Sequence, residues 1–324
     1  MLLGYRHSVA TSLLVELRAL DVAEATEDFR AERVLPEHLR QPFSKLGLAF
    51  GLMIYALALG TSAPAQSSSP PAPSAAVSAK IDDAATLARR LRNPVTSLLN
   101  IPLVENFDFG GGPNHNGERS TLNFEPIVPV LLDERWKLVS RLTLPVIDQR
   151  NIIPGTSQDG LGDTVERLLL SPAKPNRLGI NWGLGPAFLL PTATNEHLGY
   201  DRWGVGPAMA LNWHQGPWTA SVLTYQIFSV AGGGTHSIDT VTIQPSLSYI
   251  LPTGTTLTLS SDSNYDWRSA QYTFPLNATV YQLVKIGDEP INLGAGVRYY
   301  VARPDGAAQW GLRCSVTFLF PMSP

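Results

Sequence analysis

Residues Val241–Leu251, with the sequence VTIQPSLSYIL, decide the fold class. Apolar and polar side chains alternate along this segment. Because successive side chains of a β-strand point to opposite faces, the segment forms a strand with one apolar and one polar face. The apolar face carries Val241, Ile243, Pro245, Leu247, Tyr249 and Leu251, and the polar face carries Thr242, Gln244, Ser246 and Ser248.

Similar segments recur over the C-terminal two thirds of the chain and predict about twelve strands. Most are close to the roughly 9–11 residues that a tilted strand needs to cross the hydrocarbon core of an outer membrane. Besides Val241–Leu251, the segments are Leu99–Phe109, Leu122–Leu132, Trp136–Val146, Asp163–Leu170, Ile180–Leu190, Trp203–Trp213, Trp218–Val230, Thr255–Trp267, Tyr272–Gln282, Ile291–Val301 and Leu312–Phe320.

The connections between these segments alternate in length, counted from the first strand. Short periplasmic turns that alternate with longer outer loops are typical of an outer-membrane barrel, whereas a soluble sandwich has no reason to keep this order. We therefore predict an all-β fold, a closed antiparallel up-and-down transmembrane β-barrel over residues 98–321, with both termini in the periplasm. The long connections are Gly110–Glu118, Asp148–Asp159, Ala193–Asp201, Ala231–Asp239 and Ala302–Gln309, and the short ones are Asp133–Arg135, His214–Pro217 and Pro252–Gly254.

Tryptophans near the predicted strand ends fit the aromatic girdles at which a barrel meets the lipid headgroups. We expect outer-membrane lipids as partners there. The last strand, Leu312–Phe320, is apolar on one face and ends in an aromatic residue, which suits recognition by the barrel-assembly machinery. The predicted membrane-interface tryptophans are Trp136, Trp203, Trp213, Trp218, Trp267 and Trp310.

The N-terminal part predicts export. An apolar run over residues 46–60 follows Arg40 and Lys45 and precedes Ala63-Pro64-Ala65. A positive region, a short apolar region and a small-x-small site make a secretory signal peptide, which we expect to be cut after Ala65; a permanent anchor is the alternative. Residues 1–65 are thus an upstream extension plus a signal peptide, with the true start downstream of Met1, and the destination is the bacterial outer membrane.

Residues 66–97 form a Ser/Pro-rich linker followed by a short periplasmic helix. Ile81–Leu91 shows helical spacing, arginines crowd its C-terminal end and complement the helix dipole, and Asn93-Pro94 stops it. Two placements are open for this helix: the periplasmic mouth of the barrel, or the bore itself as a plug.

Prolines inside the predicted strands conflict with a closed barrel, because proline cannot donate to a strand ladder and a barrel has no free edge. Either these strands bulge near their ends, or some strand boundaries are displaced by a few residues. The prolines in question are Pro126, Pro129, Pro145, Pro186, Pro207, Pro245 and Pro275.

A series of short motifs in fixed order carries a resemblance to a known family. The series is Asn93-Pro94-Val95, Phe124-Glu125-Pro126 with Val128-Pro129, Ser140-Arg141 with Leu144-Pro145, Gly160-Leu161-Gly162-Asp163, Ser171-Pro172, Leu190-Pro191-Thr192, Trp203-Gly204-Val205-Gly206-Pro207, Gln244-Pro245 and Trp310-Gly311-Leu312-Arg313. Over Asn93–Pro321 the chain resembles the outer-membrane family named "putative MetA-pathway of phenol degradation". The resemblance implies a transporter-like barrel for small aromatic or hydrophobic compounds, without catalytic residues to carry over. Glu125 departs from the glutamine expected beside that proline.

Strand parity directs six charged side chains into the bore. Their strands become neighbours when the last strand closes on the first, so we expect one charged patch. It is either a constriction that selects a polar or anionic group or a structural ion-pair network, and the structural role is favoured because an inward charge costs less than a lipid-facing one. The six residues are Asp108, Glu125, Lys137, Arg141, Arg298 and Arg313.

Composition excludes several functions. Only 16% of residues are charged and the net charge is −3, which gives nucleic-acid binding little support. Cys314 is the one cysteine, so no disulfide framework forms, and we expect no metal and no cofactor. We predict a non-enzymatic channel that passes an unidentified small solute passively. The alternatives are a lipid or ester hydrolase, for which His236-Ser237 and His214 are weak candidates, and a structural or adhesive barrel.

Overall fold

The computed structural model describes residues 84–234, 237–286 and 289–320. The predicted signal peptide, its cleavage site, the linker up to residue 83, His236 and the C-terminal residues 321–324 lie outside the described residues. Within them, a short helix over residues 84–91 precedes a single large β-sheet. This agrees with the C-terminal part of the helix expected at Ile81–Leu91. The part of the chain that the structure describes contains no helix that is long and apolar enough to cross a membrane.

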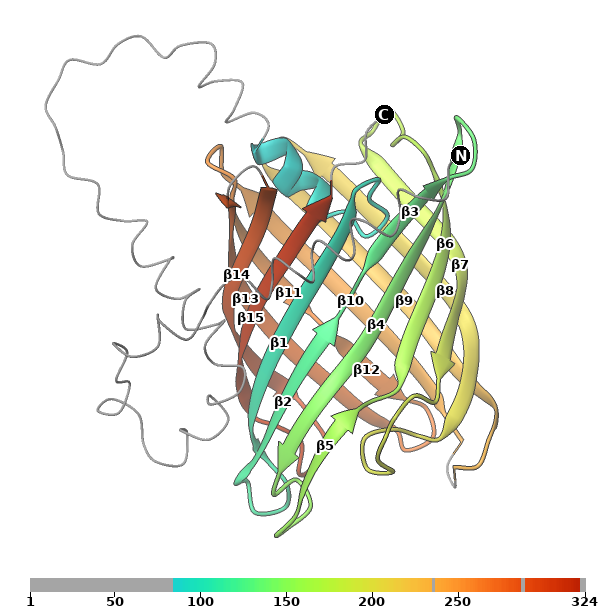
Figure 1. The fold of residues 1–324 in the computed structure, drawn as a ribbon, viewed down its shortest axis with the longest axis vertical. Helices are drawn as coiled ribbons and strands as arrows, with labels where there is room; N and C mark the ends of the chain where they lie inside the picture. The colour runs from blue at the N-terminus through green and yellow to red at the C-terminus, as the bar shows by residue number, and fades with distance from the viewer. Residues whose placement is uncertain (1–83, 235–236, 287–288, 321–324) are drawn as a thin grey trace, which may run out of the picture. The chain divides into compact units, whose positions relative to one another are not determined.

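Fifteen strand segments make up the sheet, and each pairs antiparallel with its neighbours (Figure 1). The first strand pairs with the last over eleven residue pairs, from Leu99↔Phe320 to Phe109↔Trp310, so the sheet closes on itself. The segments are β1 (Leu99–Gly111), β2 (Gly117–Phe124), β3 (Ile127–Leu131), β4 (Trp136–Arg150), β5 (Ser157–Leu161), β6 (Thr164–Pro172), β7 (Ile180–Leu190), β8 (Arg202–Gln215), β9 (Trp218–Gly232), β10 (Asp239–Ile250), β11 (Thr255–Ser261), β12 (Ser263–Asp266), β13 (Gln271–Ile286), β14 (Glu289–Ala302) and β15 (Trp310–Phe320).

The fifteen segments form twelve barrel strands, as predicted. β2 and β3 pair with β4 in one continuous register, and β11 and β12 do the same against β10. β5 and β6 pair with β4 in registers that differ by one residue, which is the signature of a β-bulge at Gly162-Asp163. Each of these three pairs is therefore one barrel strand with a local interruption.

The in-strand prolines behave in two ways. Pro126 lies in the break between β2 and β3, and Pro275 lies at a register shift near the start of β13, in line with displaced boundaries and bulged strand ends. Pro186 of β7 lies opposite Pro207 of β8, and the β7–β8 ladder runs through both without a break. The β6–β7 and β8–β9 ladders instead skip pairs at this level. The reason is that the nitrogen of Pro186 faces β6 and that of Pro207 faces β9, and neither nitrogen carries a hydrogen to donate. Pro186 and Pro207 thus lie within the wall, and they cost ladder bonds without changing the register.

Close backbone approach accompanies these proline sites. A Cβ atom added to Gly185 would lie 1.8 Å from the carbonyl oxygen of Leu168, and one added to Gly206 would lie 1.9 Å from that of Gln226. Only glycine therefore fits before each proline, which accounts for the repeated Trp-Gly-x-Gly-Pro-Ala sequence on β7 and β8.

Several connections that were expected to be long loops are partly strand. β4 continues to Arg150 and β5 starts at Ser157, so only residues 151–156 connect them. The β7–β8 connection, residues 191–201, is longer and is tied to the β5–β6 bulge, because the Asp163 carboxylate accepts hydrogen bonds from the backbone N–H groups of Ala193 (3.2 Å) and Tyr200 (2.6 Å). Leu198 of this connection is buried, with its side chain near Gly160.

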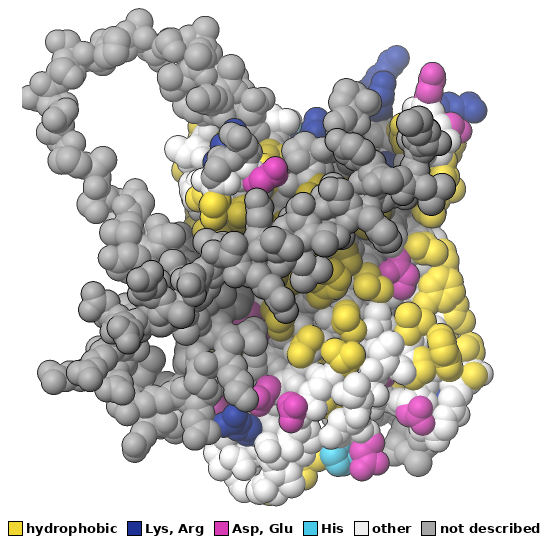
Figure 2. Space-filling view, viewed as in Figure 1, with side chains coloured by type: hydrophobic (Ala, Val, Ile, Leu, Met, Phe, Trp, Pro, Cys, Tyr) yellow, Lys and Arg dark blue, Asp and Glu magenta, His cyan; other side chains and the backbone are white. Residues whose placement is uncertain are grey.

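The outer wall is apolar, and hydrophobic side chains gather in a band across the part of it that is visible in Figure 2. Along β8, for example, the outward positions carry Val205, Met209 and Leu211. The predicted interface tryptophans lie at strand ends or just beyond: Trp136, Trp213 and Trp218 at the rim of the β3–β4 and β8–β9 turns, and Trp203, Trp267 and Trp310 at the opposite rim.

Candidate functional site: the barrel lumen

The inner face of the barrel is divided into an apolar half and a polar half. The apolar half lies mainly on β4 and β6–β9, where inward side chains pack together and are almost fully buried. Small side chains predominate on β7 and β8, so the wall itself leaves room for groups from elsewhere. The buried apolar cluster consists of Val95, Ile127, Val139, Leu169, Ala187, Leu189, Ala208, Ala210, Leu223, Ile227 and Ile238, with Val165 and Tyr225 packed against it.

The polar half lies on β10–β15 and continues onto β1 and β2. Its inward side chains are hydroxyls, amides and charged groups, many of which are equally buried. Examples are Ser248 and Thr258, whose hydroxyl groups are 2.9 Å apart across β10 and β11. The main buried members are Asn106, Asp108, Ser248, Thr256, Thr258, Asn277, Thr279, Asn292, Arg298, Ser315 and Thr317.

Residues 92–97, which link the helix to β1, enter the lumen; we call this stretch the plug segment. Val95 is completely buried and belongs to the apolar cluster, and a Cβ atom on Gly183 would lie 2.7 Å from its Cγ1 atom. The Arg92 guanidinium stacks on the Tyr281 ring, 4.0 Å from the ring centroid. Of the two placements left open by the sequence, the structure thus puts the residues after the helix inside the bore.

Two of the six predicted bore residues hold the plug segment. The Arg141 Nη1 atom donates to the carbonyl oxygen of Pro94 at 3.0 Å. The Lys137 ammonium group, on the same strand, donates to the Ser97 hydroxyl at 2.8 Å. Both side chains point inward from β4, so their visible role is to bind this segment.

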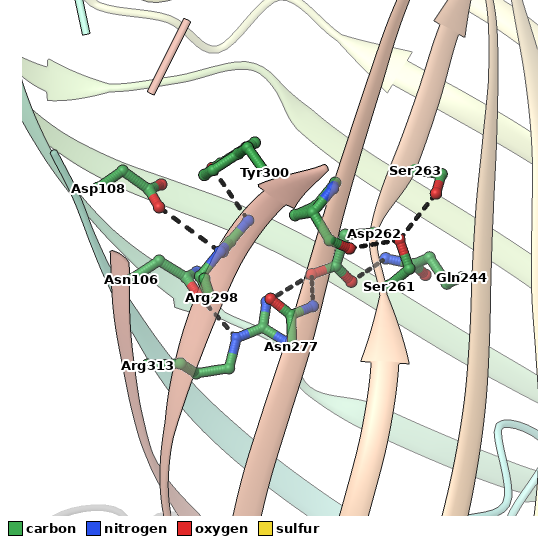
Figure 3. Close-up of polar contacts among 11 residues, drawn as sticks. Asn106, Asp108, Gln244, Ser261, Asp262, Ser263, Asn277, Arg298, Tyr300 and Arg313 are labelled. Atoms are coloured by element: carbon green, nitrogen blue, oxygen red, sulfur yellow. Dashed lines mark hydrogen bonds and ion pairs between the residues drawn. The ribbon is translucent and has the colours of Figure 1, made fainter. Parts of the chain in front are cut away.

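Two others form an ion pair on the polar half. The Arg298 Nε atom lies 3.5 Å from Asp108 Oδ1, and both side chains are about nine-tenths buried. Arg298 also donates to the Tyr300 hydroxyl at 3.2 Å (Figure 3). An inward ion pair with this degree of burial keeps its charges away from lipid and links β14 to β1 across the intervening β15.

Arg313 lies at the centre of the polar half. Its Nη2 atom is 2.5 Å from Asp262 Oδ2, and its Nε atom donates to Asn106 Oδ1 at 2.7 Å. Asp262 also accepts from the amides of Asn277 (3.2 Å) and Gln244 (3.3 Å), so five side chains from five strands meet (Figure 3). Charge-assisted bonds of this kind are stronger than neutral ones.

Glu125, the remaining predicted bore residue, lines a cavity together with Arg141 and Arg313. The structure therefore brings three of the six predicted residues to one cavity, pairs Asp108 with Arg298, and sets Lys137 against the plug segment.

A cavity of about 210 Å³ lies where the plug segment faces the polar half. Glu125, Arg141 and Arg313 from the predicted set line it, together with Asp262 and Arg92. The cavity is therefore bordered by both the wall and the plug segment, and its shape depends on where that segment sits.

Sequence reasoning missed several charged groups of the lumen, among them Arg92, Arg167 and Asp262. Asp262 and Arg167 have inward parity on predicted strands, so the alternation of side chains could have predicted that both point into the lumen. The run Ser260-Ser261-Asp262-Ser263 hid it for Asp262, because a strand without apolar residues does not show which face is outward. Arg92 follows the helix, and no strand parity applies to it.

His214, a candidate for catalysis, contacts the backbone carbonyl of Trp218 (3.0 Å) and the hydroxyl of Thr219 (3.2 Å) through its Nδ1 atom. Ser237, the other candidate hydroxyl, follows His236, which lies outside the described residues. Within the described ranges, no group of three or more His, Cys, Asp or Glu side chains could hold a metal ion.

Comparisons with known proteins support the fold. No family model and no curated protein matches the chain. Among solved structures, it is similar to the COG4313 outer membrane channel from Pseudomonas putida F1, with a TM-score of 0.56 and 15% identity over 71% of this chain and 98% of that one. It also matches outer membrane phospholipase A from Escherichia coli (TM-score 0.43, 13% identity, 73% and 98% covered) and the KdgM porin (0.39, 12%, 68% and 99%).

The fold and the lumen together define the class. A closed, antiparallel, twelve-stranded barrel with an apolar outer wall and a partly polar interior is a transmembrane barrel of the outer-membrane type. At these identities the likeness concerns the fold, and the lumen must supply the argument for function.

Proposed function

We propose that this protein is an outer-membrane channel for passive passage of small molecules, closed in the described state by its own plug segment. The observation that carries the proposal is that a stretch of chain occupies the lumen: Arg141 and Lys137 of β4 bind Pro94 and Ser97, and Val95 packs beside Gly183 of β7. Withdrawal of residues 92–97 would join the cavity to the periplasm.

The resemblance to the phenol-degradation family leads us to propose small aromatic or hydrophobic compounds as solutes. The similarity in fold to the COG4313 channel agrees with a channel of this type. We further propose export to the bacterial outer membrane by cleavage after Ala65, insertion by the barrel-assembly machinery through β15, and contact with membrane lipids through the six interface tryptophans.

A reversible disulfide between the plug segment and the wall tests the proposal. Val95 Cγ1 lies 2.7 Å from the position of a Cβ atom on Gly183, so cysteine side chains at the two positions would lie within reach of each other. We expect the variant V95C/G183C, with Cys314 replaced by serine, to conduct in planar bilayers and to allow liposome swelling when reduced. Oxidation should stop both, because the plug segment can no longer leave.

The matched control is V95C with Cys314→Ser, which has no partner for a disulfide and should conduct equally under both conditions. Conductance and swelling that are the same in oxidised and reduced V95C/G183C would contradict a mobile plug. A deletion of residues 66–97 that still shows neither conductance nor solute flux would overturn the channel itself.

The hydrolase and the structural barrel remain the alternative functions. Release of fatty acid or alcohol from phospholipid or ester substrates by the purified protein, lost on His214→Ala, would favour the hydrolase. A barrel that passes no solute in any state would favour the structural role.

A further inference from the structure

The lining of the cavity beside the plug segment is chemically mixed. Its apolar residues are Pro102 and Val104 of β1, Ile127 of β3 and Leu223 of β9. Its other residues carry hydroxyl, amide and charged groups, and many of the hydroxyls come from β10–β15. A solute that fills it must therefore present an apolar body as well as a polar group.

Two residues that line this cavity carry a buried donor without a partner among the described residues. These donors are the Arg141 Nε atom and the Ser315 hydroxyl oxygen. The Ser315 residue is only 2% exposed, so the hydroxyl cannot turn to bulk solvent. Buried polar groups without a hydrogen-bond partner are costly. We therefore expect a bound molecule with acceptor atoms to complete the hydrogen bonds of these two donors.

The charges around the cavity leave an excess of cation. Arg313 and Asp262 compensate each other directly at 2.5 Å. Among the lining residues this leaves the guanidinium groups of Arg92 and Arg141 against the single carboxylate of Glu125. The lining thus carries one net positive charge, which one monoanion would balance.

We propose that this cavity binds a small amphipathic organic monoanion, a carboxylate attached to a compact apolar body. The proposal rests on the channel function and names its class of solute. The Arg141 guanidinium binds the carboxylate, Ser315 supplies a further donor from β15, and the apolar body packs against Val104, Ile127 and Leu223. Because Arg141 also holds Pro94, an anion that competes for this guanidinium loosens the plug segment.

Calorimetric titration of the detergent-solubilised mature protein with benzoate, benzamide and benzylamine tests the proposal. The three probes share a ring and differ in the charge of their polar group. We expect benzoate to bind at least about tenfold more tightly than benzamide, the effect of one charge-assisted hydrogen-bonded contact, and benzylamine to bind least. Arg141→Gln should reduce benzoate affinity to the level of benzamide, and Ser315→Ala should reduce it about threefold.

Lys137→Gln is the matched control. Lys137 is a second inward cation of β4 that holds the plug segment through Ser97, but it does not line the cavity. Because it acts only through the position of the plug segment, its loss should change the affinities for benzoate and benzamide by the same factor and leave the preference for benzoate unchanged. If Arg141→Gln does not fold, as judged by heat-modifiable migration in gels, the probe preference of the unaltered protein and the Ser315→Ala variant decide.

Equal affinities for benzoate and benzamide, or no binding of any probe, would overturn the proposal. Loss of the benzoate preference in Lys137→Gln as well would also overturn the proposal. The preference would then come from the positive charges of the lumen in general and not from a contact with Arg141. If the protein binds benzoate but fails the swelling and conductance tests, the binding site is supported and the channel function is refuted. Failure of the binding proposal and failure of the channel proposal are therefore distinguishable.

Discussion

The two halves of the lumen share one outer wall and differ inside. On β6–β9 an apolar cluster of inward side chains packs together and on Val95, although a few buried polar groups such as Arg167 and Asn212 also lie on these strands. On β10–β15 the inward side chains are hydroxyls, amides and charges held in hydrogen bonds and ion pairs around Arg313. The lumen is therefore filled in two ways at once, by apolar packing and by a polar network, and the cavity beside the plug segment is lined by residues of both kinds.

The difference predicts how each half responds to substitution. Packed apolar groups tolerate loss of volume poorly and tolerate charge least of all, whereas a polar network is sensitive to the removal of one partner. Four substitutions test this division, and free energies of unfolding in lipid or detergent, measured with urea, provide a common scale for the first three.

The largest effect is expected for Ala210→Asp. Ala210 is completely buried in the apolar cluster, so the carboxylate would have no partner, and the cost should reach about 5 kcal/mol. Thr279→Asp is the control on the polar half, opposite Gly296 and near Arg313, and should cost much less. Equal costs for the two variants would show that the halves do not differ in polarity as described.

The next effect is expected for Asp262→Asn. It leaves the Arg313 guanidinium in the lumen without its carboxylate, which should destabilise the barrel by about 3 kcal/mol. The double variant Asp262→Asn with Arg313→Gln should recover part of this loss, because it removes both charges. A double variant that is as unstable as the sum of the single variants would mean that the pair is not coupled.

A somewhat smaller effect is expected for Leu169→Ala. Its side chain is completely buried and lies near Gly183 beside the plug segment, so a cavity should cost about 2.5 kcal/mol. Leu170→Ala, the next residue on the outer face, is exposed and should cost clearly less. The reverse order would mean that the inner face of β6 is not the packed one.

The smallest effect is expected for Tyr281→Leu. This removes the stacking of Arg92 and should weaken the hold on the plug segment by about 1 kcal/mol, or roughly a fivefold change. The readout is the rate at which a cysteine at position 95 reacts with a thiol reagent, in a background with Cys314→Ser. Tyr299→Leu, on the outer face, is the control and should leave the rate unchanged; an equal rise in both variants would contradict the stacking.

The fold was predictable from the sequence because a strand that faces lipid on one side must alternate with a period of two. Segments such as Val241–Leu251 fix their outward face without knowledge of their neighbours. The six inward charges followed from the same parity. Their partners did not, because Asp262 and Arg313 are 51 residues apart in the chain and meet only through closure and register.

The prolines show where local reasoning fails. From the sequence, Pro186 and Pro207 only count against a strand. In the barrel they lie opposite each other and turn their missing donors to the strands on either side, so the β7–β8 ladder survives. Whether a proline breaks a strand depends on which neighbour its nitrogen faces, and that is a property of the pairing.

The sequence by itself determined the class of fold, the twelve strands and the inward direction of the charges, since all three follow from the alternation of side chains along single strands. The tertiary structure alone decided that the lumen has an apolar and a polar half, that residues 92–97 fill it, and that a cavity remains between Arg141 and Asp262. The physical reason is that contacts across a bore join strands through closure of the sheet, and no local pattern in the chain specifies which side chains then meet.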